Sequence, residues 1–361
     1  MYLISRLTRR ILPLLGLIGL AAALSGCNWV VMKPHGDIAQ QQADLIVTST
    51  LLMLLIIVPV IVLTLFFAWR YRESNTEATY TPEWDHSTRL ELMIWGAPLL
   101  IIIVLGAITW ISTHKLDPYR PLDRIDAQRT VPADVKPLVV EVVALDWKWL
   151  FVYPEQGMAT VNELAAPVDR PIEFKITAST VMNAFYIPEL AGMVYAMPGM
   201  ETKLHAVINK AGVYQGLSAN YSGGGFSDMR FKFHGLSPED FERWVASNKA
   251  DGLKLDRAGY LKLEQPSQRD GVRRYASVDA DLYGAILNRC VDASKMCMNQ
   301  MMAIDARGGL GKGGVSGLTQ QSWRTADGMQ QRTVVASLCT PVNPTGKALA
   351  MTPAAAVVAQ P

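Results

Sequence analysis

The chain has 361 residues, of which 50% are hydrophobic and 18% are charged, and its formal net charge is +2. This near-neutral balance argues against a nucleic-acid partner, since the sequence holds no basic stripe or aromatic-interleaved Lys/Arg patch. The length is sufficient for a real core, and the apolar residues concentrate toward the N-terminus. That concentration indicates membrane segments rather than a uniformly hydrophobic globule.

Residues 1–26 have the pattern of a lipoprotein signal peptide. Arginines at positions 6, 9 and 10 precede an apolar run, which ends in Leu24-Ser25-Gly26-Cys27. Small residues before a cysteine are typical of lipoprotein cleavage, so this segment is excluded from the fold. We expect Cys27 to be the lipidated first residue of the mature chain, followed by a short periplasmic segment over residues 27–44. A buried structural cysteine is the alternative.

Two long apolar runs, residues 45–69 and 92–112, predict transmembrane helices, because each can cross a bilayer core of roughly 30 Å. Pro59 lies inside the first run and Pro98 near the start of the second, which is tolerable where neighbouring groups satisfy the freed carbonyl. Lipidation takes place on the outer face of the membrane. The loop over residues 70–91 is therefore expected in the cytoplasm, in agreement with its arginines, and everything beyond the second span in the periplasm.

The periplasmic part begins with a proline-rich linker over residues 113–137. Short β-rich runs separated by turn signals follow over residues 138–235, and their spacing predicts a β-sandwich. The expected strands are residues 139–150, 160–164, 171–178, 184–187, 194–197, 201–208, 212–217 and 229–234.

Beyond the sandwich, Ser237-Pro238-Glu239-Asp240 has the composition of a helix start, with a capping serine, an early proline and acids at the positive end of the dipole. We expect a helical arm over residues 236–288. The chain then becomes rich in Gly, Gln, Ser and Ala without periodicity, so residues 289–361 are expected to form a low-complexity, largely disordered tail.

The stretch 213–229 is the most informative part of the sequence. Aligned without gaps, this stretch resembles the copper loop of subunit II of the heme-copper oxidases. In that family two cysteines, a glutamate, a histidine and a methionine lie on the loop, and a second histidine lies upstream. The corresponding residues here are Ser218 and Ser222, Asn220, Phe226, Met229 and, upstream, Asn183.

These substitutions remove the chemistry of a copper site. A copper pair needs soft thiolates and imidazoles, whereas a serine hydroxyl is a poor, hard ligand and phenylalanine has no lone pair. Met229 alone cannot hold copper. The resemblance therefore implies vacated copper-ligand positions, with no metal bound by this chain.

Within the superfamily the pattern is similar to subunit II of the bo-type ubiquinol oxidases, from about residue 26 to about residue 283. The resemblance implies two transmembrane helices followed by a cupredoxin-like Greek-key sandwich in the bacterial inner membrane. It implies a non-redox subunit of a proton-pumping complex that oxidises ubiquinol and reduces oxygen to water. Catalytic subunit I would hold the heme and copper cofactors, and cytochrome c would not be a partner.

The resemblance also suggests a role for Glu91, which opens the second span on the cytoplasmic side. In similar subunits the glutamate of this motif lies at the mouth of a proton pathway into subunit I. A carboxylate there could collect protons. The alternative is a solvated acid that the helix dipole favours.

Three other groups carry weaker signals. The alternating aromatic row is interpreted as sheet packing, because an electron path would need a copper acceptor, and the scattered histidines as surface or packing residues. Cys290 and Cys297, among several methionines, could bind Cu(I), form a periplasmic disulfide that leaves Cys339 odd, or have no specific role, which we favour. The row is Trp147, Trp149, Phe151 and Tyr153, and the histidines are His35, His86, His114, His205 and His234.

Two alternative functions stay open on the sequence alone. A cytochrome c oxidase subunit II would need the missing cysteines and histidines. A stand-alone membrane lipoprotein with a cupredoxin-like binding domain would purify without a heme-bearing partner.

Overall fold

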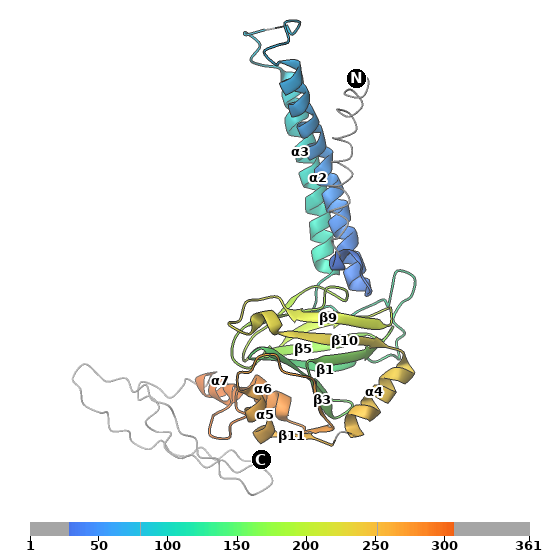
Figure 1. Cartoon of the computed structure of the whole chain (residues 1–361), viewed down its shortest axis with the longest axis vertical. Helices are drawn as coiled ribbons and strands as arrows, with labels where there is room; N and C mark the ends of the chain where they lie inside the picture. Colours follow the sequence, from blue (N-terminus) through green and yellow to red (C-terminus); the bar gives the residue numbers. More distant parts are fainter. Residues whose placement is uncertain (1–28, 80, 251, 307–361) are drawn as a thin grey trace, which may run out of the picture.

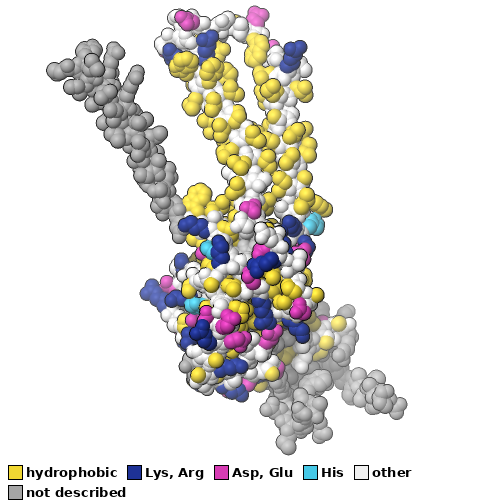
Figure 2. Space-filling model, turned by 90° about the vertical axis from the view of Figure 1, so that its right-hand side faces the viewer, with side chains coloured by type: hydrophobic (Ala, Val, Ile, Leu, Met, Phe, Trp, Pro, Cys, Tyr) yellow, Lys and Arg dark blue, Asp and Glu magenta, His cyan; other side chains and the backbone are white. Residues whose placement is uncertain are grey.

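The computed structural model describes residues 29–79, 81–250 and 252–306. After a short 3-10 turn, η1 (Val30–Met32), two long helices, α2 (Asp37–Arg70) and α3 (Thr88–Lys115), form a hairpin that projects from a β-rich domain (Figure 1). Both helices are long and apolar enough to cross a membrane, and their apolar windows are not buried inside the protein. Figure 2 shows their hydrophobic side chains facing outward, as a lipid-embedded hairpin requires.

Helix α2 begins eight residues before the predicted span, because its first turns pack against the domain rather than lie in the membrane. Ala39 and Ala43 are buried there, at 2% and 5% exposure. Further along, the helix passes Pro59 without ending. The nearby Thr64 hydroxyl donates to the carbonyl of Val60 at 2.7 Å, so its polar group is satisfied within the helix.

The domain is a sandwich of two mixed sheets. The larger sheet has the strand order β12-β3-β2-β1-β5-β8 and the smaller the order β4-β10-β9-β6-β7. Each contains one parallel pair, β1 with β5 and β4 with β10. The strands are β1 (Leu138–Leu145), β2 (Lys148–Tyr153), β3 (Met158–Val161), β4 (Glu163–Pro167), β5 (Ile172–Ala178), β6 (Asn183–Tyr186), β7 (Val194–Ala196), β8 (Thr202–Ala206), β9 (Gly212–Ser218), β10 (Arg230–Leu236) and β12 (Arg273–Tyr275).

Aromatic side chains fill the space between the sheets. Trp149 and Phe151 of β2 meet Phe185 of β6 and Phe231 of β10, and the rings of Phe185 and Phe231 stack at 5.5 Å. Gly216 faces Phe231 so closely that an added Cβ would lie 2.0 Å from the ring, so this position has to be glycine. The core thus fixes β6 and β9, which carry Asn183 and Ser218, and β10, which begins directly after Met229.

Two of the expected strands are each divided by a residue in the left-handed region. Residues 139–150 form β1 and β2, separated at Trp147 with φ 63°, and residues 160–164 divide at Asn162 with φ 57°. The Asn162 side chain supports its turn, because its Oδ1 accepts the Trp149 backbone N–H at 2.9 Å. A left-handed residue interrupts the strand ladder, so β3 and β4 enter different sheets.

The segment expected as a helical arm contains strands as well as helices. β12 extends the larger sheet, and Tyr260, Leu263 and Ile286 cover the outer face of that sheet in a second hydrophobic cluster. Burial of this apolar face, rather than helical propensity, explains the short elements. The further elements are α4 (Pro238–Ala250), β11 (Lys254–Leu255), α5 (Arg257–Glu264), β13 (Ser277–Val278) and α6 (Leu282–Leu287).

Structure continues into the segment expected to be disordered. Cys290 and Cys297 form a disulfide with a Cα–Cα distance of 4.8 Å, and α7 (Met298–Ala306) follows directly. The favoured interpretation of this cysteine pair, no specific role, is therefore wrong, and the disulfide alternative applies. Cys27, Cys339 and the remainder of the tail lie outside the described residues.

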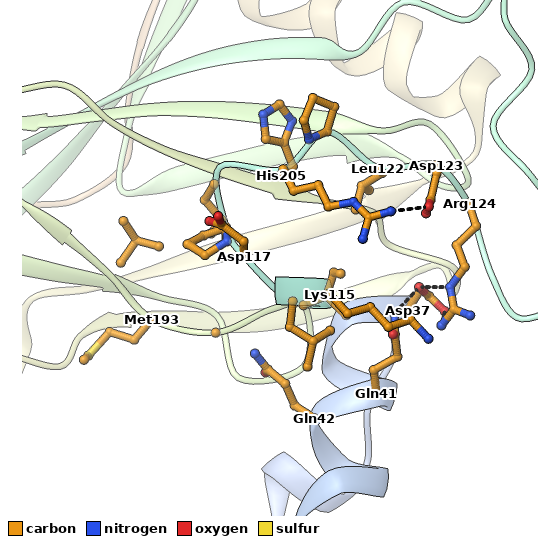
Figure 3. Close-up of a pocket in the computed structure, with 18 residues that line it drawn as sticks. Asp37, Gln41, Gln42, Lys115, Asp117, Leu122, Asp123, Arg124, Met193 and His205 are labelled. Carbon is orange, nitrogen blue, oxygen red and sulfur yellow. Dashed lines mark hydrogen bonds and ion pairs between the residues drawn. The ribbon is translucent and has the colours of Figure 1, made fainter. Parts of the chain in front are cut away.

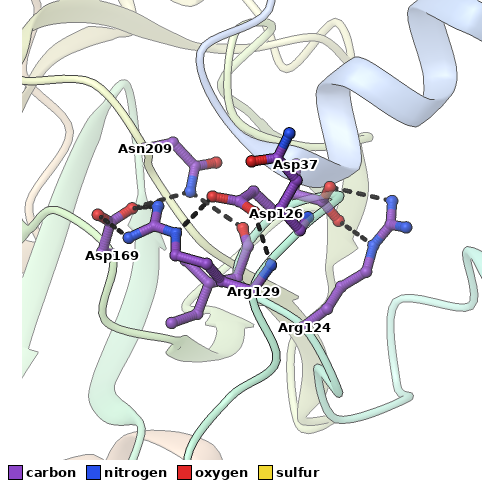
Figure 4. A network of polar contacts seen from close by, with 8 residues as sticks. Asp37, Arg124, Asp126, Arg129, Asp169 and Asn209 are labelled. Carbon is purple, nitrogen blue, oxygen red and sulfur yellow. Dashed lines mark hydrogen bonds and ion pairs between the residues drawn. The ribbon is translucent and has the colours of Figure 1, made fainter.

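Ion pairs attach the hairpin to the domain (Figure 4). The Asp37 carboxylate, only 5% exposed, accepts hydrogen bonds from Arg124 Nε at 2.9 Å and Nη2 at 3.0 Å. Along the same linker Arg129 contacts Asp169 at 2.8 Å. The first turn of α2 is therefore held to the linker by a buried, two-pronged contact.

Removing the Asp37 charge is expected to weaken this junction. Asp37→Asn leaves the Arg124 guanidinium without its counter-charge, which should lower the free energy of unfolding by about 2–3 kcal/mol, the low end for a broken buried pair because Arg124 is partly exposed. Thermal unfolding of the full chain in detergent measures this. The control is Asp44→Asn, on an exposed position of the same helix. Equal unfolding temperatures for the two variants would contradict the expectation.

Candidate functional site

Asn183 and Ser218, two of the six copper-loop positions, form a buried polar pair. They lie on neighbouring strands, β6 and β9, and are 1% and 3% exposed. The Ser218 hydroxyl donates to Asn183 Oδ1 at 3.1 Å, and the Asn183 amide donates to the carbonyl of Val181 at 3.1 Å. Each side chain is thus satisfied by protein, as buried polar groups must be.

Ser222 and Phe226 occupy the outer part of the loop. Phe226 opens the 3-10 turn η2 (Phe226–Asp228) and packs edge-on against Tyr221 at a ring distance of 5.6 Å. The Ser222 carbonyl accepts a hydrogen bond from Trp147 Nε1 at 3.0 Å. Gly225 lies beneath the same indole, and an added Cβ there would lie 2.4 Å from the ring. The loop is therefore packed on Trp147.

Asn220 and Met229 complete the set. The Asn220 amide donates to the Met182 carbonyl at 3.2 Å on the surface. Met229 is 1% exposed, and its carbonyl accepts the backbone N–H of Ser218 at 3.1 Å. The fold therefore brings Asn183, Ser218 and the Met229 backbone together, with the other three positions in the adjoining loop.

The donor set at these positions does not fit a copper pair. It offers amide oxygens, hydroxyls and one thioether, and no thiolate or imidazole. In the part of the chain that the structure describes, no group of three or more His, Cys, Asp or Glu residues could hold a metal ion. The chemistry available at these positions is hydrogen bonding and packing.

Glu91 lies at the opposite end of the molecule, in the first turn of α3. Its carboxylate is 2.7 Å from His86 Nδ1, and the side chains are 49% and 63% exposed. The pair is thus reachable from water at the end of the hairpin remote from the β-domain. His86 was not singled out with Glu91 in the sequence, because the loop between them has no helical periodicity.

The aromatic row divides into two parts. Trp149, Phe151 and Tyr153 are fully buried in the core, so the packing interpretation is confirmed for them. Trp147 is different, since it lies in the turn before β2 and supports the copper-like loop. Only its positive φ distinguishes it, and the sequence around it holds no glycine that would signal such a turn.

Three of the histidines have clear packing or polar contacts. His35 lies against the Tyr214 ring at 5.1 Å, and His114 against Trp110 at 4.6 Å. His234 Nε2 is 3.3 Å from the Glu163 carboxylate. These contacts explain the histidines as structural groups.

The Glu141 carboxyl of β1 has a raised pKa. Burial raises its pKa to about 7, although Lys175, its register partner on β5, works against the rise and Glu201 adds to it. At mildly acidic pH the folded protein therefore holds the Glu141 carboxyl in its neutral form.

Replacing Glu141 tests this protonation. An unfolded chain releases the proton near pH 4.5 and the folded chain near pH 7, so the folded state binds more protons between these values and stability falls as pH rises through them. Glu141→Gln should raise the free energy of unfolding by about 1–2 kcal/mol at pH 8, after discounting for partial exposure, and change little at pH 4. Chemical unfolding of the full chain at both pH values measures it. Glu242→Gln, on the exposed side of α4, is the control, and an unchanged pH profile for Glu141→Gln would refute the account.

Comparisons with known proteins agree with this geometry. The family model described as cytochrome c oxidase subunit II, periplasmic domain, matches residues 155–234, and that described as the COX aromatic rich motif matches residues 249–294. Cytochrome bo(3) ubiquinol oxidase subunit 2 of Pseudomonas putida is 50% identical over 77% of this chain and 85% of its own length. The chain belongs to the ubiquinol oxidase subunit 2 family.

Two further comparisons bear on the extent of the family. Ubiquinol oxidase subunit 2 of Acetobacter aceti is 48% identical over 76% of this chain and 86% of its own length. The periplasmic domain of subunit II of cytochrome oxidase from Bradyrhizobium japonicum is 22% identical over 34% of this chain and 97% of that domain, with a TM-score of 0.31. Membership in the ubiquinol oxidase subunit 2 family therefore depends on the sequence relatives.

The aromatic rich motif locates a part of the family that the sequence alone described only as a helical arm. Its match includes α5, β12, β13, α6 and Cys290. These elements cover the outer face of the larger sheet, as described above. In this subunit 2 the arm is thus an integral layer of the domain rather than an appendage.

Proposed function

We propose that this chain is the copper-free subunit 2 of a proton-pumping terminal oxidase, in which ubiquinol is oxidised and oxygen is reduced to water. The relatives named as ubiquinol oxidase subunits, among them proteins 50% and 48% identical, support the quinol as electron donor. The observation that carries the proposal is the buried Asn183–Ser218 pair, because it supplies neither thiolate nor imidazole where a copper pair would need them.

The loss of these ligands has a physical logic. A quinol is lipid-soluble and delivers its electrons from within the membrane, so the complex needs no electron port facing water. The heme and copper cofactors belong, on this proposal, to catalytic subunit I. Cytochrome c has no acceptor on this domain and is not a partner.

The chain's own contribution is then positional. The hairpin α2 and α3 would embed in the inner membrane beside subunit I, and the domain would cover its periplasmic face. Cys27 would carry the lipid anchor on that side. Glu91, at the opposite end of the hairpin, would lie at the cytoplasmic mouth of a proton pathway, with His86 as its contact.

Affinity purification of the full chain from membranes tests the proposal. We expect a large heme-bearing membrane subunit to co-purify, and we expect no copper in the subunit 2 band after the subunits are separated. A chain that purifies alone would support the stand-alone lipoprotein instead. Copper in the separated chain would support a cytochrome c oxidase subunit II.

A further inference from the structure

A cavity of about 130 Å³ lies where the hairpin joins the domain. Its walls come from the first turns of α2, the end of α3, the linker that follows, and strands β7 and β8 of the domain. Figure 3 shows the side chains that line it, among them Lys115 at the end of α3, Asp117 of the linker and His205 of β8. At about 30 Å³ for each water molecule, the space suits a small polar group rather than a peptide segment.

The cavity lies at the level of the membrane surface. Lys115 is the last residue of α3, and Trp110, 70% exposed, lies five residues earlier on the same helix. Five helical residues correspond to about 7.5 Å along the axis. Tryptophan is typical of the boundary between hydrocarbon and headgroups, so Lys115 and the cavity are at headgroup depth once the hairpin is embedded.

Two of the three cations lining the cavity already have acidic partners. Arg120 Nη2 is 2.6 Å from the Asp123 carboxylate, and Arg124 Nε is 2.9 Å from that of Asp37. Within each of these two pairs the positive and negative charges cancel. They leave little net charge to attract a purely anionic ligand.

The remaining two charged groups are of opposite sign. The Lys115 side chain is exposed, and its ammonium group makes no hydrogen bond or ion pair to any residue that the structure describes. Among the residues with described positions, the Asp117 carboxylate accepts only the backbone N–H of Tyr119, at 2.9 Å, and has no cation. The cavity therefore offers one free ammonium group and one free carboxylate.

His205 adds a buried group without a partner. The residue is 8% exposed and lines the cavity, and its ring makes no hydrogen bond within the described part of the chain. Its position is fixed, because its backbone N–H donates to the Pro118 carbonyl at 3.0 Å. The ring lines the cavity and has no protein partner there among the residues described, so this imidazole is available to a ligand.

The rim of the cavity includes apolar side chains. Met193 is 43% exposed there, and Leu116 and Ile38 also line the space. A ligand with a polar head and an apolar continuation would match this combination, because the apolar part could extend along the exposed hairpin.

We propose that this cavity binds the headgroup of a zwitterionic phospholipid of the phosphoethanolamine class. The phosphate would contact Lys115 and His205, and the ammonium group would contact Asp117. A lipid of this kind would complete the seam between the hairpin and the domain.

The test uses the full chain reconstituted in nanodiscs of equal parts phosphatidylethanolamine and phosphatidylglycerol, with retained lipids counted by native mass spectrometry. We expect the wild-type chain to retain phosphatidylethanolamine preferentially. Lys115→Gln should reduce retention about tenfold, the effect of one lost charged hydrogen bond, and Lys115→Arg should restore most of it. Asp117→Asn should abolish the preference over phosphatidylglycerol. Arg70→Gln, which removes one cation at the other end of the hairpin, is the control.

Each contrary result has a definite meaning. Equal retention of both lipids by the wild-type chain would overturn the zwitterionic assignment. Equal retention by Lys115→Gln and Arg70→Gln, with both variants folded by circular dichroism, would overturn the site. Displacement of the lipid by millimolar inorganic phosphate would show a soluble-anion site instead. None of these results depends on oxidase activity, so they are separable from the proposed function.

Discussion

The full chain carrying Asn183→His, Ser218→Cys, Asn220→Glu, Ser222→Cys and Phe226→His is expected to bind a copper pair and turn purple. The wild-type chain should take up none. The scaffold is already in place, since β6 and β9 pair at Phe185 and Ser218 and the Met229 backbone contacts Ser218. Thiolate and imidazole donors would then stand at the positions the copper loop requires.

The control keeps Ser218 and carries the other four substitutions. It lacks one thiolate, so its copper content should fall and the purple absorption should be lost. Metal analysis and visible spectra of folded, detergent-solubilised protein provide the measurement. If the five-substitution chain folds and takes up no copper, the alignment of residues 213–229 with the copper loop is wrong.

In the assembled oxidase, Glu91→Gln should slow ubiquinol oxidation and proton uptake by roughly ten- to a hundredfold. The reason is that glutamine cannot exchange a proton, whereas a positioned acid–base group contributes on the order of a hundredfold or more to proton transfer. Glu91 is suited to this role by its half-exposed position and its 2.7 Å contact with His86.

The matched control is Glu83→Gln, which removes an exposed carboxylate from the same loop without touching α3. Glu91→Asp should keep part of the activity, because it retains a titratable group. Stopped-flow proton uptake and oxygen consumption are the measurements. Wild-type rates in Glu91→Gln would reduce Glu91 to an acid that stabilises the helix start.

The sequence predicted the two apolar helices and the sandwich because both depend on local pattern: long charge-free runs and alternating short strands. It did not predict the breaks at Trp147 and Asn162, since neither position holds glycine and each turn is stabilised by distant contacts, such as the Trp147 indole on Ser222. The arm was described as helical because its short strands exist only through pairing between distant residues, β12 with β3 and β11 with β13.

The candidate site likewise combines features that follow from local sequence with features that depend on distant contacts. The identities at the copper-loop positions could be read from spacing, but the direct Asn183–Ser218 hydrogen bond could not. The contact between Asp37 and Arg124 joins residues 87 positions apart, and no local signal links them. The cavity at the junction is also non-local, because its free groups come from a helix end, a linker and a strand.

Electron-donor preference tests the central claim most directly. Oxygen consumption by the purified complex should be rapid with ubiquinol and absent with reduced cytochrome c, because this domain offers no copper to accept electrons from the water-soluble donor. Rapid oxygen consumption with cytochrome c and none with ubiquinol would contradict the account.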